Sequence, residues 1–72
     1  MGYNAFTIFN KFKPKMISQG HSKDIDYKFF ILKLREHYGF TEDTAKRYAI
    51  DFLEIGYIKI DKNESGNVVN FI

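Results

Sequence analysis

The sequence predicts a small α+β domain in which three helices precede a C-terminal β-hairpin. Two apolar stripes at helical spacing are joined by a short turn around Gly39. After Gly56 the pattern changes to alternating apolar and polar residues that flank a run of turn formers. The chain has 72 residues, of which 44% are hydrophobic and 18% aromatic, and this composition argues against disorder. We therefore expect residues 1–72 to fold as one domain.

The first helix is expected over residues 4–13. Its apolar residues recur at intervals of three and four: Ala5, Ile8, Phe9 and Phe12. The same segment also fits the alternation of a strand, which is the alternative for this part of the chain. We expect the helix to end at Lys13, because the residue before a proline is disfavoured in helical geometry. An irregular connection follows, in which Met16 and Ile17 could add a short edge strand.

The second helix is expected over residues 24–38. Either Ser22 or Asp24 can cap its first amide groups. One apolar stripe consists of Tyr27, Phe30, Ile31, Leu34 and Tyr38, and it is widened by Ile25, Phe29 and Leu32. The helix should stop at Gly39, because glycine tolerates the left-handed conformation at a helix end. Phe40 then anchors the turn in the core.

The third helix is expected over residues 41–55. Thr41 is its cap, and the acids Glu42 and Asp43 in the first turn favour the positive end of the helix dipole. The predicted buried stripe is Ala45, Ala49, Phe52 and Leu53. The spacing also places Phe30 and Leu34 of the second helix against this stripe.

The C-terminal segment, residues 57–72, is expected to form a β-hairpin. Ile58 and Ile60 should share one face, and Tyr57 and Lys59 the other. The run "DKNESGN" is rich in turn formers, and "VVNFI" returns to strand character.

The charge of the chain is unevenly distributed. The formal net charge is +2, and residues 1–23 contain Lys11, Lys13, Lys15 and Lys23 without an acid. The third helix is acidic by two charges. A basic segment beside a near-neutral body is compatible with an anionic partner, and it is equally common as a source of solubility.

The residues do not suggest an enzyme, a metal site or a cofactor. His21 and His37 are far apart in a chain without cysteine, and they have no third ligand at metal-binding spacing. The chain has no Gly-rich phosphate loop, and its serines lack a base with an orienting group. No apolar run approaches the length of a membrane span, so we expect a cytoplasmic protein without a membrane partner.

The stretch "GFTEDTAKRYAIDFLEIGYI", together with the hairpin after it, resembles a winged helix-turn-helix domain. It is similar to the pattern of Gly, an apolar residue, Ser or Thr, two free positions, Thr, a small residue, one free position, Arg, Tyr or His, and a Leu before "GYI". The resemblance covers about residues 24–72 and is strongest to small DNA-binding regulators of archaea and of their viruses and plasmids. The N-terminal third departs from the pattern, because it has no clear first-helix and strand signature.

The resemblance implies that the segment 41–55 is a recognition helix in the major groove of double-stranded DNA, with the hairpin as the wing. Arg47 could bind guanine edges or phosphate, Lys46 phosphate, and hydroxyl groups the phosphate oxygens. The implied DNA-binding residues are Thr41, Glu42, Thr44, Lys46, Arg47 and Tyr48 in the helix, and Lys59, Lys62, Asn63 and Ser65 in the hairpin. The alternative is an ordinary charged surface whose cations pair with neighbouring acids, and Tyr48 could instead be half-buried core.

The implied function is that of a transcriptional regulator, and two alternatives remain open. The same fold could dock a protein partner through an aromatic surface that includes Tyr3, Phe6, Phe9 and Tyr57. It could also be an architectural or excision-type factor that bends DNA. A homodimer through the aromatic N-terminal segment is a further expectation, and a viral protein of this kind would act in the host cytoplasm.

Overall fold

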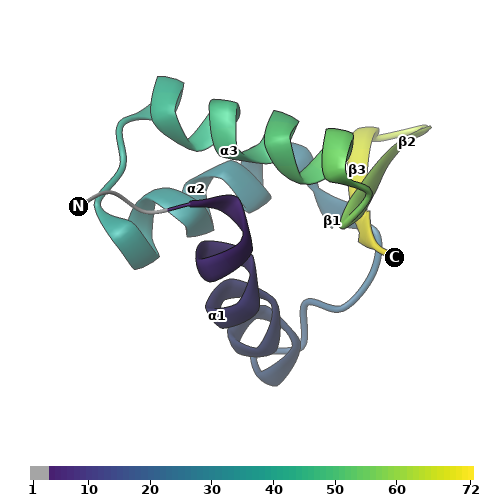
Figure 1. Ribbon diagram of the computed structural model, residues 1–72. Coiled ribbons are helices and arrows are strands. Elements are labelled where there is room, and N and C mark those ends of the chain that lie inside the picture. Colours follow the sequence, from purple (N-terminus) through teal and green to yellow (C-terminus); the bar gives the residue numbers. More distant parts are fainter. Residues whose placement is uncertain (1–3) are drawn as a thin grey trace.

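A computed structural model describes residues 4–72, which form three helices and a three-stranded antiparallel sheet (Figure 1). The small α+β class and the C-terminal hairpin are therefore confirmed. The elements in chain order are α1 (Ala5–Ser18), β1 (Ile25–Asp26), α2 (Tyr27–Tyr38), α3 (Glu42–Ile55), β2 (Ile58–Asn63) and β3 (Gly66–Phe71).

The sheet has the strand order β1-β3-β2, with all neighbours antiparallel. In the hairpin, Ile60 lies opposite Val69, and Asn63 lies opposite Gly66 across the turn. The backbone N–H of Ser65 donates a 2.8 Å hydrogen bond to Asn63 Oδ1, which closes this turn. This element order and sheet order are compatible with a winged helix.

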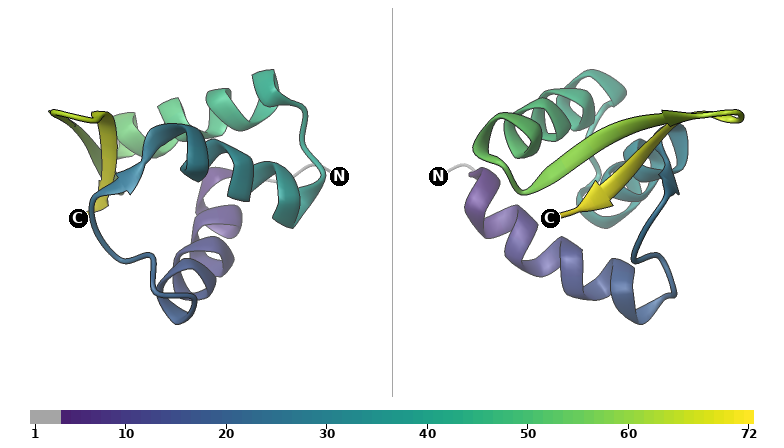
Figure 2. Two further views of the ribbon diagram at one scale, coloured as in Figure 1. Left: turned by 180° about the vertical axis from the view of Figure 1, so that it is seen from behind. Right: turned by 90° about the vertical axis from the view of Figure 1, so that its right-hand side faces the viewer.

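The helices surround one core, and the sheet closes one end of the molecule. Figures 1 and 2 show α3 along the top and α1 along the underside. The Phe9 and Phe52 rings bring these two helices into contact, with centroids 5.0 Å apart, and Phe12 meets Phe30 of α2 edge-on at 5.2 Å. All fully buried side chains among residues 4–72 are apolar. Aromatic contacts therefore supply much of the packing that a chain of this length needs.

The prediction that the first helix ends before Pro14 is wrong, because α1 continues to Ser18. Pro14 has no N–H to donate to the carbonyl of Asn10, a defect that costs about 3 kcal/mol in a helix interior. The extra turn brings Met16 into the core, where it is fully buried. The helix ends at Ser18; just beyond it Gly20 adopts a φ of 89°, and the N–H of His21 donates to Met16 O at 2.9 Å.

The predicted start of the second helix is also wrong, because residues 25–26 form β1. Ile25 lies opposite Val69 of β3, so its burial comes from the sheet rather than from a helix stripe. The N-cap of α2 is Asp26, whose carboxylate accepts a 3.1 Å hydrogen bond from the N–H of Phe29. The short edge strand is thus β1, opposite the edge strand β2, and Met16 and Ile17 belong to α1.

Two apolar residues assigned to buried stripes lie at the surface. In α3, Ala45, Ala49 and Phe52 are buried as predicted, but Leu53 is 41% exposed. In α2, Leu32 is exposed as well. Both are the outermost members of their stripes, where no further element covers the helix. The predicted contact of Leu53 with the core is therefore wrong.

Candidate nucleic-acid interface

The turn between α2 and α3 is held by a stack of three aromatic rings. Gly39 ends α2 in the left-handed region, with a φ of 70°, and its N–H donates to Arg35 O at 2.7 Å. Phe40 stacks on Tyr38 at 5.2 Å and on Tyr48 at 5.0 Å, with interplanar angles of 15° and 19°. This stack fixes α3 relative to α2. Tyr48, an expected DNA-binding residue, is half-buried in it.

Thr41 and Thr44 are joined at the start of α3. The N–H of Thr44 donates to Thr41 Oγ1 at 3.2 Å, as expected for a helix cap, and Thr41 Oγ1 donates to Thr44 Oγ1 at 3.0 Å. The two hydroxyl groups therefore stabilise the start of the helix. Each keeps lone pairs that can accept a further bond.

Lys46 forms an ion pair with Glu42 one helical turn before it. The distance from Lys46 Nζ to Glu42 Oε2 is 3.0 Å, and Arg35 of α2 lies 4.0 Å from the other carboxylate oxygen. The hydrogen bond and the charge of Lys46 lower the pKa of Glu42, and the same pair raises the pKa of Lys46. All three side chains are exposed to solvent, so the pair is easily exchanged for other contacts.

A groove between α2 and α3 gathers cations that the sequence reasoning missed. It is lined by the apolar or aromatic side chains of Tyr27, Ile31 and Leu32 and by the charged side chains of Lys28, Arg35, Glu42 and Lys46. Lys28 and Arg35 are seven residues apart on α2, a spacing that places them on the same helix face. This seven-residue spacing can be read in the sequence, and it could have indicated that Lys28 and Arg35 lie on one face of α2.

Arg47 lies on the other flank of α3. It lines a second groove beside the N-terminal end of α1, together with Asn4, Ala5, Asp43, Thr44, Tyr48 and Asp51. Arg47 is exposed and forms no ion pair with any residue in the described range 4–72. Lys46 and Arg47 thus flank the outward face of α3 on its two sides.

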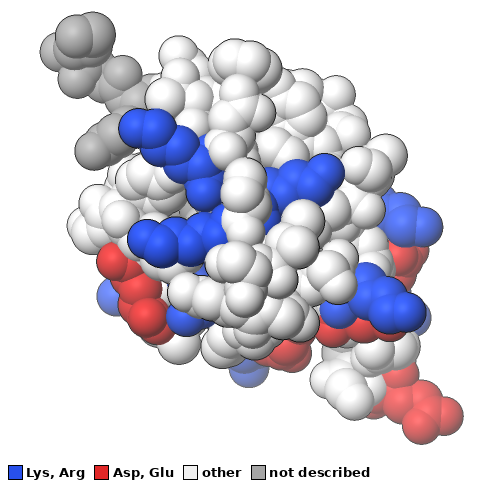
Figure 3. All heavy atoms as spheres, turned by 90° about the horizontal axis from the view of Figure 1, so that it is seen from below, with Lys and Arg blue, Asp and Glu red and all other residues white. Residues whose placement is uncertain are grey.

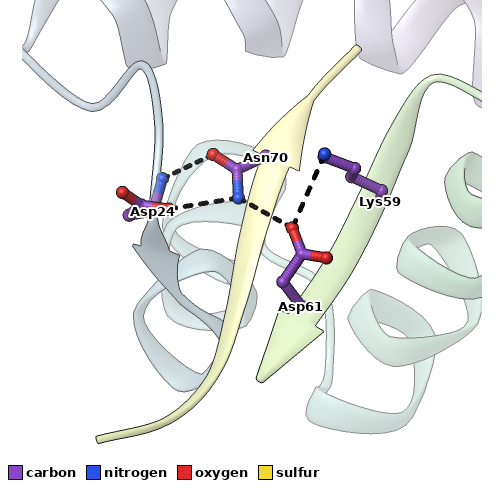
Figure 4. Close-up of polar contacts among 4 residues, drawn as sticks. All are labelled: Asp24, Lys59, Asp61 and Asn70. Atoms are coloured by element: carbon purple, nitrogen blue, oxygen red, sulfur yellow. Dashed lines mark hydrogen bonds and ion pairs between the residues drawn. The ribbon is translucent and has the colours of Figure 1, made fainter. Parts of the chain in front are cut away.

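The hairpin residues divide between the turn and the outer face of the sheet. Lys62, Asn63 and Ser65 lie exposed at or near the turn, and Asn63 is used to close it. Lys59 instead points to Asp61, at 3.9 Å, within a network that Asn70 extends to Asp24 (Figure 4). The Asn70 amide donates to both carboxylates at 3.3 Å, so Lys59 has an acidic environment.

The hairpin turn lies next to the N-terminal end of α2. A third groove is lined by Asp26, Tyr27 and Lys28 of one segment and by Ser65, Gly66 and Asn67 of the other. Because Lys28 lines both this groove and the α2–α3 groove, the two form one continuous surface. The structure thus brings Lys46, Lys28 and Ser65 to one side of the molecule, while Lys59 belongs to a separate polar cluster.

The aromatic residues considered for protein docking are mostly used inside the domain. Phe9 is buried and stacks on the half-buried Tyr57 with ring centroids 4.6 Å apart, so Phe9 is not available to a partner as the docking alternative requires. Phe6 is 62% exposed and remains available. Tyr3 lies outside the described residues.

Within residues 4–72 there is no group of three or more His, Cys, Asp or Glu side chains arranged to hold a metal ion. None of the helices there is both long enough and apolar enough to cross a membrane. Comparison of the chain with protein-family models, curated proteins and solved structures found no match.

Proposed function

We propose that this protein is a winged helix-turn-helix transcriptional regulator that binds double-stranded DNA with α3 in the major groove. The observation that supports this most strongly is the surface shared by the exposed flank of α3, the start of α2 and the hairpin turn, with Lys28 at its centre. A helix in the major groove with a hairpin beside it is an established way of reading DNA.

In this arrangement the residues have separate roles. Arg47 is the cation of α3 without an ion pair among residues 4–72, and it reads a base edge through its planar fork. Lys28, Arg35, Lys46 and Lys62 bind phosphates on either side of the groove. With four such contacts, the logarithm of the binding constant should fall with the logarithm of the salt concentration at a slope of about −3 to −4.

The acids of α3 determine how strongly this binding depends on sequence. Asp43 and Asp51 line the same groove as Arg47, and α3 is acidic by two charges overall. Carboxylates repel the phosphate backbone, so non-specific affinity should be low. Discrimination between sites should then depend mainly on Arg47.

The proposal is tested by titrating labelled duplexes, first a random pool and then a site selected from it, over a series of salt concentrations. Arg47→Ala should weaken binding to the selected site by about 1–3 kcal/mol and relax preference at one base position. Lys62→Ala should weaken all sequences alike and reduce the salt slope by about one unit. Glu54→Ala, at the far end of α3, serves as the control that leaves affinity nearly unchanged. Equal effects of Arg47→Ala and Glu54→Ala would show that α3 does not enter the groove.

The ion pair of Lys46 offers an independent check. Glu42→Gln removes the partner of Lys46 and one negative charge from the α2–α3 groove. It should therefore tighten DNA binding and steepen the salt dependence. Unchanged or weaker binding by a normally folded Glu42→Gln variant would place the α2–α3 groove away from DNA.

A protein-docking function is the second candidate, and the exposed apolar residues of α3 favour it. Ile50 is 53% exposed on α3 and Leu53 is also at the surface, where a partner could cover them. This alternative predicts no duplex binding even at low salt. Salt-sensitive binding that Arg47→Ala weakens would exclude it as the main function.

Self-association through α1 remains part of the proposal, because regulators of this kind bind paired half-sites as dimers. Phe6 supports it as the exposed aromatic residue of α1. Phe6→Ser should shift the protein to monomer in sedimentation velocity without lowering its melting temperature. A wild-type protein that is monomeric at high micromolar concentration, both free and on DNA, would contradict it.

A further inference from the structure

A stripe of hydrogen-bond donors runs along α1 on the underside of the molecule. Thr7, Lys11 and Lys15 follow one another at intervals of four residues and are all exposed. They therefore lie on one face of α1, about one helical turn, or about 6 Å, apart. We call these three residues the α1 stripe.

The surroundings of the α1 stripe are also cationic. Helix α1 contains three lysines and no acid. Lys33 and His37 of α2 lie near Lys15; burial, and then the charges of Lys15 and Lys33, lower the pKa of His37, so Lys33 and not His37 adds positive charge here. One acid, Glu36, balances Lys33 at 3.8 Å. Figure 3 views the molecule from this side, and Lys and Arg side chains gather over its middle while most Asp and Glu lie toward the margin.

The two lysines of the α1 stripe lie away from the proposed α3 interface. The N-terminal end of α1 adjoins α3, where Ala5 lines the groove of Arg47. From there α1 runs away from α3 along the underside (Figures 1 and 2). Lys11 and Lys15 are about 9 Å and 15 Å further along the axis than Ala5. Lys11 and Lys15 therefore lie beyond the part of α1 that a duplex in contact with α3 would reach.

We propose that the α1 stripe binds the phosphate backbone of a second DNA duplex, so that one molecule joins two duplexes. Donors without an accompanying acid are suited to phosphate oxygens, and α1 has no planar guanidinium group for reading bases. The contact is therefore independent of sequence. The inference depends on the proposed function only for the first duplex, which α3 binds; the contact of the second duplex with α1 does not depend on it.

The test measures the joining of duplexes directly. Donor-labelled and acceptor-labelled copies of one short duplex are mixed with protein, and energy transfer between them is followed over a salt series. Lys11→Gln with Lys15→Gln removes both charges at little cost in helix propensity. This double variant should bind a single duplex as tightly as wild type and lose the energy transfer. The salt slope of any remaining transfer should fall by about two units.

Two matched variants control for charge and fold. Lys13→Gln with Lys23→Gln removes the same charge outside the α1 stripe, because Lys13 lies over the Phe9 and Phe71 rings on the other flank of α1. It should leave the energy transfer intact. Lys11→Arg with Lys15→Arg restores both charges and should restore the transfer. Melting curves of all variants check that they are equally folded.

Each remaining outcome separates this inference from the proposed function. Wild type that never joins duplexes, or a Lys11→Gln, Lys15→Gln variant that joins them normally, overturns the inference. If that variant still joins duplexes while Arg47→Ala does not, two copies of α3 in a dimer are responsible, and the proposed function stands alone. If the Lys11→Gln, Lys15→Gln variant loses all DNA binding while Arg47→Ala binds DNA as wild type does, α1 is the DNA contact and the proposed role of α3 fails.

Discussion

Two neighbouring residues of α3, Phe52 and Leu53, should differ sharply in what they contribute to stability. Phe52 is fully buried, and its ring lies 5.0 Å from Phe9 and 6.4 Å from Tyr57. Truncation leaves a cavity between α1, α3 and the start of the hairpin, so Phe52→Ala should cost about 3–5 kcal/mol. A domain of 72 residues has a free energy of unfolding of about 4–11 kcal/mol, so this change removes much of it.

Leu53→Ala should cost at most about 1 kcal/mol. Its side chain is 41% exposed, and solvent fills the space that truncation leaves, so no cavity contribution is added. Alanine also has a slightly higher helix propensity than leucine.

Urea denaturation followed by far-ultraviolet circular dichroism measures both changes. Phe52→Leu is the milder companion variant if Phe52→Ala does not fold, and it should still be less stable than Leu53→Ala. A Leu53→Ala variant as unstable as Phe52→Ala would mean that the buried face of α3 is rotated from the one described. The aromatic contact between α1 and α3 would then not be the main support of the fold.

The remaining predictions concern the helix ends and one histidine. Pro14→Ala should raise the melting temperature, because alanine supplies the N–H that the carbonyl of Asn10 lacks, and a gain of about 1–3 kcal/mol is expected. A lower melting temperature would mean that the proline ring has a packing role. Thr41→Ala should lower the free energy of unfolding by about 1 kcal/mol through loss of the cap, whereas Thr41→Ser should retain most of it. Burial, and then the charges of Lys15 and Lys33, lower the pKa of His37 below 6.5, so the unfolded chain binds more protons than the folded one below that pH. Stability should therefore be full above about pH 6.5 and fall as the pH drops toward the folded pKa of His37, and His37→Gln should flatten this dependence in urea midpoints. A wild-type profile that matches that of His37→Gln would contradict the assignment.

The candidate interface was partly accessible to sequence reasoning. The expected residues Lys46 and Arg47 are exposed on α3, and Lys62 and Ser65 lie at the hairpin turn. Lys28 was missed because its importance comes from the contact between α2 and the hairpin, which joins residues far apart in the chain. Lys59 was also among the expected residues, but Asp61 lies 3.9 Å from it on the sheet surface.

The sequence by itself determined the features that depend on neighbours within a few residues. The cap at Thr41, the helix end at Gly39 and the hairpin turn near Ser65 all follow from backbone geometry and short-range hydrogen bonds. These interactions are completed locally, so a local pattern is sufficient to predict them.

Only the tertiary structure decided which apolar residues are covered and how far α1 extends. Pro14 is a strong local signal against helix, yet the burial of Met16 beyond it offsets that cost. Ile25 entered a strand because β3 offered it a partner, and Leu53 stayed at the surface because no element packs over its side of α3. In each case the deciding free energy comes from burial against residues distant in the chain, and periodicity along one helix carries no information about which elements will cover it.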